Sequence, residues 1–105
     1  MTLQVTITSD TTLPAGKPVR VEVRDTSVAD AAAIVVTSQT ARVPPSGEPL
    51  VVTLQLDRVE SGYTIWAHVD TDSNGRVSKG DLITMESYPV ARSGEQTTVR
   101  VRSVN

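Results

Sequence analysis

The residues best suited to chemistry in this chain of 105 residues form one acidic segment, from residue 70 to residue 81. Its sequence, Asp-Thr-Asp-Ser-Asn-Gly-Arg-Val-Ser-Lys-Gly-Asp, matches the calcium-binding loop in which oxygens at positions 1, 3, 5, 7, 9 and 12 surround the ion. Gly75 falls at position 6, where the loop must turn sharply. The spacing predicts a calcium site built from the side chains of Asp70, Asp72, Asn74, Ser78 (through a bridging water) and Asp81, with the backbone carbonyl of Arg76.

The segments on either side of this loop complicate the prediction. Calcium loops of this type usually join two helices, but residues 62–69 and 82–86 have the composition and pattern of β-strands. Asp81 is also one methylene shorter than the usual glutamate, which makes bidentate closure harder. The alternative is a hairpin connection in which Asp72, Ser73, Asn74 and Gly75 form tight turns without an ion. The residues leave both readings open, with a calcium loop on a β-hairpin as the first.

The rest of the chain predicts the β-strands that would hold this loop. Valine, threonine and isoleucine make up 35 of the 105 residues, and their branched side chains favour strands. Alternating segments separated by proline and glycine turns predict strands at residues 2–9, 19–24, 33–41, 50–57, 63–69, 82–86 and 97–104. About seven short strands indicate a single antiparallel two-sheet β-sandwich domain over residues 1–105, of the immunoglobulin or transthyretin-like kind. Its core is predicted to contain Leu3, Val5, Ile7, Val19, Val21, Val23, Leu50, Val52, Leu54, Leu56, Val99 and Val101.

The composition excludes several classes of function. The chain has no cysteine, so it has neither disulfides nor a thiolate metal site. A net charge of −2 argues against nucleic acid and anionic membranes as partners. No apolar run approaches the length of a membrane span, and the alternating residues 1–9 do not resemble a signal peptide. We therefore expect a cytosolic protein, or one from which a leader has been removed, with no membrane contact of its own.

His68 is the single histidine and could in principle act as a catalytic base. A catalytic base needs a nucleophile nearby, and no serine or threonine stands in a recognisable catalytic context. We therefore expect no enzymatic activity.

Outward-facing arginines on two strands could form a basic stripe for an acidic partner. The alternative, which we favour, is a solvated sheet face with cross-strand charge pairs. These arginines are Arg20, Arg24, Arg100 and Arg102.

Three segments together resemble a known family. They are Leu13-Pro-Ala-Gly16 followed by the strand and turn at residues 19–31, the strand beginning at Tyr63, and Gly80-Asp-Leu-Ile-Thr-Met-Glu-Ser-Tyr-Pro-Val90. In this order they are similar to the YbaY family of bacterial cell-envelope proteins, which is related to the YscW-type lipoprotein chaperones of type III secretion. The resemblance implies a β-sandwich without catalytic residues, and the acidic loop would place the chain in a calcium-binding subgroup.

Two roles follow as expectations. The first is a non-enzymatic envelope binding or assembly module in which calcium braces the acidic hairpin; it would lie in the cell envelope or periplasm if a leader has been removed, and otherwise in the cytoplasm. The second is a secretion-associated chaperone that offers a strand edge or an apolar sheet face to a protein client and has no functional metal site. In both cases we expect a monomer whose partner is an envelope or secretion-system protein.

Overall fold

The computed structural model describes residues 2–27, 33–45, 50–90 and 96–104. Its strands are β1 (Thr2–Ser9), β2 (Pro18–Asp25), β3 (Ile34–Arg42), β4 (Leu50–Gln55), β5 (Tyr63–Val69), β6 (Leu82–Thr84) and β7 (Gln96–Ser103). The predicted all-β class and the seven strands are confirmed. Within these described ranges, no helix is long and apolar enough to cross a membrane. Part of the predicted family segment, residues 28–31, lies outside the described residues.

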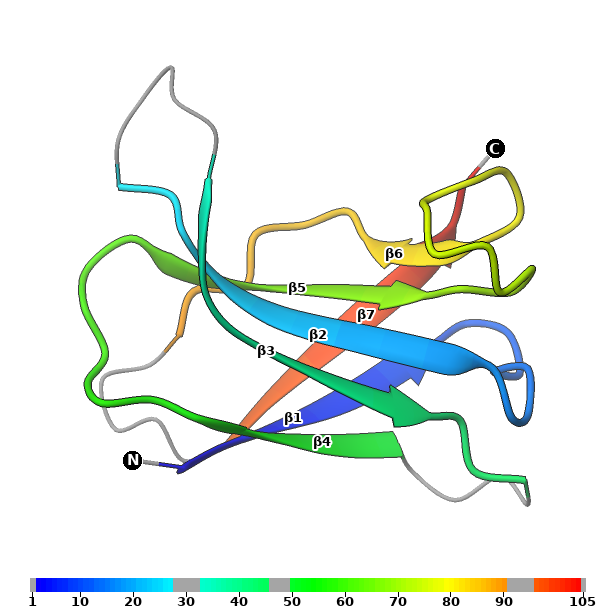
Figure 1. Ribbon diagram of the computed structural model, residues 1–105, viewed down its shortest axis with the longest axis horizontal. Helices are drawn as coiled ribbons and strands as arrows, with labels where there is room; N and C mark the ends of the chain where they lie inside the picture. The colour runs from blue at the N-terminus through cyan, green and yellow to red at the C-terminus, as the bar shows by residue number, and fades with distance from the viewer. Residues whose placement is uncertain (1, 28–32, 46–49, 91–95, 105) are drawn as a thin grey trace.

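The predicted division into two antiparallel sheets is wrong. All seven strands belong to one sheet in the order β3-β2-β5-β6-β7-β1-β4. Every neighbouring pair is antiparallel except β1 and β7, which run parallel with Val5 opposite Thr97. The sheet coils so that its two ends approach each other, and Figure 1 shows the resulting near-barrel. Alternation along a strand reveals which face is buried, but it does not reveal which strands are neighbours, and a coiled sheet has the same pattern as a sandwich.

The core lies inside the coiled sheet and matches the sequence prediction closely. Every residue of the predicted core set is at most 5 % exposed. The inward positions alternate with exposed ones on β1 and β4, as a strand with one buried face requires. Val43, Ile65, Ala67, Val69, Leu82 and Val90 complete this core.

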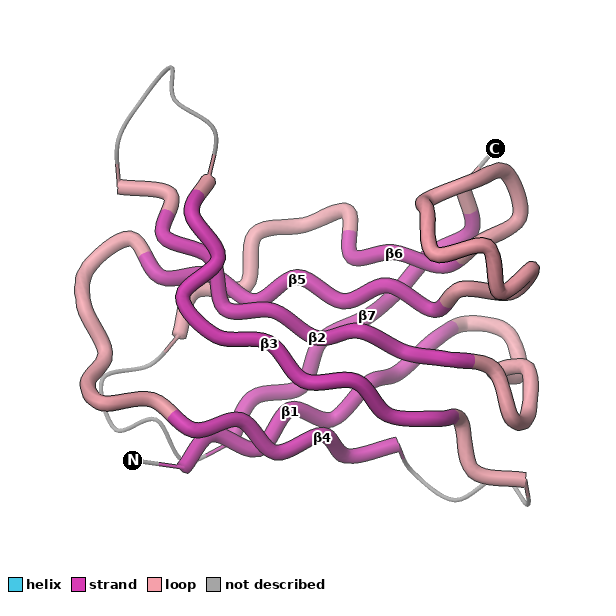
Figure 2. Tube along the Cα trace, in the orientation of Figure 1, coloured by secondary structure: helices cyan, strands magenta, loops and turns pink. Residues whose placement is uncertain are grey.

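The two edge strands, β3 and β4, face each other along an open seam. No ladder joins them in the part of the chain that the structure describes. Figures 1 and 2 show the end of β3 close to the start of β4, with the two strands separating toward their other ends. A cavity of about 450 Å³ lies at the wide end, between Val36 and Thr37 of β3 and the chain around Leu56. The seam is what keeps the sheet from closing into a full barrel.

Strand β3 differs from the other strands in its exposure. Ile34, Val35 and Val36 are 66 %, 48 % and 39 % exposed. The register to β2 shifts between Val23 and Arg24, so that Val36 is an extra residue of a β-bulge. The sequence predicted a strand here correctly, but it did not predict that three consecutive aliphatic side chains would face solvent.

Candidate functional site

The acidic loop connects β5 to β6, as predicted from the flanking strand patterns. His68 pairs with Ile83 and Val69 pairs with Leu82, so the loop stands on an antiparallel hairpin. Backbone hydrogen bonds also attach the loop to the residue after β7: Gly80 N–H donates to Val104 O, and Val104 N–H donates to Asp81 O. The loop is therefore held at its base by the β5–β6 hairpin and by the residue that follows β7.

Asp81, at position 12 of the loop, is the buried anchor of this segment. Its side chain is fully buried, and its Oδ1 accepts from the N–H of Thr71 at 2.9 Å and from the Thr71 hydroxyl at 2.7 Å. Its Oδ2 lies 2.8 Å from Nε2 of His68 and accepts from the N–H of Ser78 at 3.1 Å. A carboxylate offers about four acceptor sites. These donors therefore already occupy both oxygens of Asp81.

The electrostatics of Asp81 follow from this environment. Desolvation by burial raises its pKa, but hydrogen bonds from His68, Thr71 and Ser78 outweigh burial and lower the pKa to about 2. Asp81 is therefore ionised at neutral pH and only accepts hydrogen bonds, so Nε2 of His68 must carry the proton between them. His68 acts here as a fixed donor to a structural carboxylate.

The first half of the loop is a chain of side-chain-to-backbone turns. The Asp70 carboxylate accepts from the N–H of Asn74 at 3.3 Å and from the N–H of Gly75 at 2.7 Å, and Asn74 Oδ1 accepts from the N–H of Arg76. Ser73 and Gly75 have φ of 56° and 77°, which such turns require. This geometry agrees with the tight-turn reading of the segment.

The predicted calcium ligands lie close together in the folded loop. Asp72 Oδ2 accepts from the Ser78 hydroxyl at 2.8 Å and from Asn74 Nδ2 at 3.0 Å. The Ser78 hydroxyl also lies 3.4 Å from Asp81 Oδ2. One ligand atom each from Asp70, Asp81 and His68, which was not a predicted ligand, lie within 4.8 Å of one another. Arg76 is exposed, and its N–H donates to Asn74 Oδ1. The sequence did not single out Thr71, although a hydroxyl at position 2 of an acidic loop was a readable signal.

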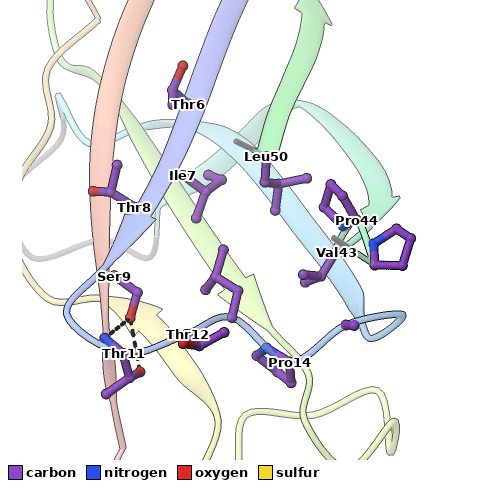
Figure 3. A pocket seen from close by; sticks show the side chains of 13 residues that line it. Thr6, Ile7, Thr8, Ser9, Thr11, Thr12, Pro14, Val43, Pro44 and Leu50 are labelled. Carbon is purple, nitrogen blue, oxygen red and sulfur yellow. Dashed lines mark hydrogen bonds between the residues drawn. The ribbon is translucent and has the colours of Figure 1, made fainter. Parts of the chain in front are cut away.

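A second candidate site is a cavity that the sequence did not predict. It has a volume of about 730 Å³ and lies at the end of the near-barrel where β1 ends, β4 begins and the chain leaves β3. Its apolar lining comprises Ile7, Leu13, Pro14, Val43, Pro44 and Leu50, and Figure 3 shows several of these side chains around the opening. Thr6, Thr8, Ser9, Thr11 and Thr12 also line it, but the Thr8 hydroxyl donates to the carbonyl of Val99 on β7, and the Ser9 and Thr11 hydroxyls bond each other. The Leu-Pro and Pro-Pro turns were its only sequence signal.

The less favoured alternative of a basic stripe is wrong, because β2 and β7 are separated by β5 and β6. Arg24 instead pairs with Glu22 at 2.7 Å and lies over the Trp66 ring. On β7, Arg100 pairs with Asp10 and Arg102 pairs with Glu86. The alternative of local charge pairs therefore describes this face of the sheet.

Comparison with known proteins agrees with this geometry. Residues 1–102 match the family model described as type III secretion system lipoprotein chaperone (YscW). No curated protein matches the chain significantly. Among solved structures, an alternative pilotin from the type II secretion system of Vibrio cholerae is similar, with a TM-score of 0.76. The two share 21 % identity, over 100 % of this chain and 97 % of the pilotin chain, which supports a shared fold.

These matches do not test the narrower likeness to YbaY or to a calcium-binding subgroup, which stay predictions. The family model nevertheless spans nearly the whole sequence. The chain therefore belongs to the YscW family of type III secretion system lipoprotein chaperones.

Proposed function

We propose that this protein is a non-enzymatic chaperone of the cell envelope that binds a segment of a secretion-system protein, with a secretin as the first candidate. The observation that carries the proposal is the apolar cavity between β1, β4 and the turn after β3. Its volume lies within the range of protein binding pockets, and apolar walls with a polar rim are the usual composition of such sites. Family membership supports a client from a secretion system.

The cavity suits a protein segment because its base is the core itself. Ile7, Val43 and Leu50 are buried residues of the main core cluster that also line the cavity. An apolar side chain entering from outside would extend this core and would gain roughly 25 cal/mol for each Å² that it removes from water. The hydroxyl of Thr12, an exposed residue of the lining, could exchange hydrogen bonds with the client backbone.

The test measures binding of peptides that tile the secretin of the same organism. We expect one contiguous segment to bind and to shift the amide signals of residues 6–15 and 43–45. Thr12→Lys, an exposed substitution at the rim, should weaken that binding at least about tenfold. Thr98→Lys, also at an exposed threonine but on β7 outside the cavity, is the matched control and should bind normally. Equal affinity for both variants would remove the cavity from the proposal.

Calcium binding by the acidic loop is a second candidate function, and it is compatible with the first. The observation that favours it is the gathering of Asp70, Asp72, Asn74 and Ser78 around a glycine with positive φ at position 6. Asp81 could join the ion only by giving up donors such as Ser78 N–H or His68. We therefore expect weak binding, on the order of 10⁻⁴ M.

A further inference from the structure

The acidic loop contains the single Asn-Gly pair of the sequence, Asn74-Gly75. Asparagine is one of the thermally labile residues of proteins. It is most labile before glycine, which has no Cβ to hinder the approach of its own nitrogen to the asparagine side chain. Both residues are exposed, so water reaches them. The reaction open to this pair is loss of the Asn74 amide, which needs neither a client nor a metal ion.

The reaction exchanges the side-chain amide of Asn74 for a carboxylic acid in two steps. The backbone nitrogen of Gly75 gives up its proton and attacks Cγ of Asn74. The bond from Cγ to Nδ2 then breaks, ammonia leaves with that proton, and a cyclic imide remains. Water opens the imide at either carbonyl and gives aspartate or isoaspartate. Water is therefore the only other reactant, and no electrons are exchanged.

In the folded loop the attacking nitrogen is already engaged. The Gly75 N–H donates to Oδ2 of Asp70 at 2.7 Å, and the N–H of Asn74 donates to Oδ1 of the same carboxylate at 3.3 Å. Backbone hydrogen bonds to a carboxylate are stronger than those between neutral groups. Asp70 is itself only 7 % exposed, and its N–H donates to the carbonyl of Pro18 on β2. Asp70 therefore keeps on Gly75 the proton that must leave before the attack.

The Asn74 side chain is held through both atoms of its amide. Oδ1 accepts from the N–H of Arg76 at 2.9 Å. Nδ2 donates to Asp72 Oδ2 at 3.0 Å and to the Ser78 hydroxyl at 3.2 Å. The attack turns this amide toward the Gly75 nitrogen and expels Nδ2, so these hydrogen bonds must break first. The closed loop thus opposes the reaction by hydrogen bonding and not by burial.

We propose that Asn74 is a site of spontaneous deamidation whose rate is set by local opening of the acidic loop, and that the Asp70 carboxylate holds the reaction back while the loop is closed. Exposed loops open at a lower free energy than core strands do. The reaction therefore proceeds in protein molecules whose sheet is intact.

The product fits the loop less well than Asn74 does. An aspartate at this position has no Nδ2 donor, so its carboxylate faces Asp72 Oδ2 as a second acceptor of the same charge. Isoaspartate adds a methylene to the backbone before Gly75 and displaces the N–H that Asp70 accepts. The modification therefore opens the loop whose closure had opposed it.

The rate is measured by mass spectrometry of the proteolytic peptide that contains Asn74, since its mass rises when the amide becomes an acid. In mildly alkaline buffer, the folded protein should react at least about tenfold more slowly than the same chain unfolded in guanidinium chloride. Asp70→Ala should accelerate the folded reaction at least about tenfold, the change that follows from losing a hydrogen bond to a charged group. Asp57→Ala, at an exposed aspartate outside the loop, is the matched control and should react like the wild type. Equal rates in the folded and unfolded chains, or in Asp70→Ala and the wild type, would overturn the proposal.

Circular dichroism shows whether Asp70→Ala is folded, and Ser78→Ala replaces it if it is not. Ser78→Ala retains Asp70 and removes one hydrogen bond of Asn74 Nδ2, so the reaction should become about two- to tenfold faster. A rate equal to that of the wild type would contradict the role of the loop contacts.

Leu54→Ala separates local opening from global unfolding. It removes a buried core side chain on β4 and leaves every hydrogen bond of Asn74 in place. Local opening predicts the wild-type rate in this variant. A rate that rises in proportion to the lost global stability would show that Asn74 reacts only in the unfolded chain, and it would overturn the proposal.

The effect of the product on the loop is tested with Asn74→Asp. Its amides in residues 70–81 should exchange with solvent faster than those of the wild type, because its carboxylate faces Asp72. Gln39→Glu makes the same change from amide to acid at an exposed position on β3 and is the control. Unchanged exchange in Asn74→Asp, or equal acceleration in both variants, would contradict the proposed opening of the modified loop.

Discussion

The acidic loop and the β3–β4 seam are both interruptions of the same sheet, but they are built in opposite ways. In the loop, the Asp70, Asp72 and Asp81 carboxylates all have hydrogen-bond donors from the loop and its flanking strand. Among the described residues, no buried side-chain polar atom lacks a partner. In the seam, no ladder joins the two strand edges within the described ranges, and aliphatic side chains of β3 face solvent.

This difference indicates which region would contribute more binding free energy to a partner. A polar cluster that is already satisfied gains little from a ligand, because any new contact replaces an existing hydrogen bond. An open edge beside exposed apolar side chains gains both backbone hydrogen bonds and apolar burial. The acidic loop contains the strongest motif in the sequence, whereas the β3 segment, which contains no motif, exposes the aliphatic side chains of Ile34, Val35 and Val36.

The largest effect is expected from removing the anchor of the loop. Asp81→Ala leaves buried donors of His68, Thr71 and Ser78 without an acceptor, and we expect it to cost about 3–5 kcal/mol of stability. Leu54→Ala is the control, since its loss of about 2–5 kcal/mol would come from the core alone. Denaturant unfolding gives both values, and native-state amide exchange should show local opening of residues 70–81 in the Asp81 variant only. A cost below about 1 kcal/mol for Asp81→Ala would contradict its role as anchor.

Lowering the pH should destabilise the folded protein by protonating the Asp81 carboxylate. The pKa of Asp81 is about 2 in the folded protein against 3.8 as the ordinary value. A lowered folded-state pKa stabilises the protein above the unfolded value, so this contribution is complete above about pH 4 to 5 and disappears as the pH falls toward 2. Thermal unfolding between pH 6 and pH 2 measures it. In Asp81→Asn this component of the pH dependence should vanish, whereas an unchanged profile would assign it to other carboxylates.

A calcium titration tests directly whether the loop binds the ion although its carboxylates already accept hydrogen bonds. If the ion binds the folded state, a hundredfold excess over its dissociation constant should stabilise the protein by about 2.7 kcal/mol. The amides of residues 70–82 should move first in a calcium titration, and Asp72→Ala should abolish the response. Magnesium at the same concentration is the control. If millimolar calcium changes neither these amides nor the melting temperature, the loop is a turn and not a metal site.

The smallest effect on stability is expected at the seam. Val35→Lys replaces an exposed side chain on an edge strand, so the free energy of unfolding should change by no more than about 0.5 kcal/mol. The same limit should hold for Val77→Lys in the acidic loop. Denaturant midpoints of the two variants should therefore be nearly equal. A loss above about 1.5 kcal/mol in Val35→Lys would mean that β3 already packs against something in the free protein.

The sequence predicted the buried faces of the strands well, because burial on one face imposes a period of two. Residues such as Val5, Val21 and Val99 were assigned to the core from alternation alone, and all are at most 1 % exposed. The hairpin position of the acidic loop followed in the same way from the residues around it. Local pattern therefore accounts for twelve of the eighteen buried core residues in the described part of the chain.

What the sequence did not predict depends on contacts between distant residues. The parallel pairing of β1 with β7 leaves no local signature, since both strands alternate as antiparallel strands do. The bond from His68 to Asp81 joins residues 13 positions apart, and the motif predicted a calcium ligand at Asp81, not an acceptor for His68. The end cavity combines residues from β1, β4 and two turns, none of which is unusual alone.

The central position of β7 has a consequence for the order in which this chain can fold. Without β7, the remaining strands form two separate groups, β3-β2-β5-β6 and β1-β4. The strand that joins them comes last in the described sequence, so the sheet cannot be completed until residues 96–103 have left the ribosome. Such long-range pairing makes folding slow. A chain that stops before residue 96 would present two additional unpaired edges, at β6 and β1, and should aggregate rather than fold.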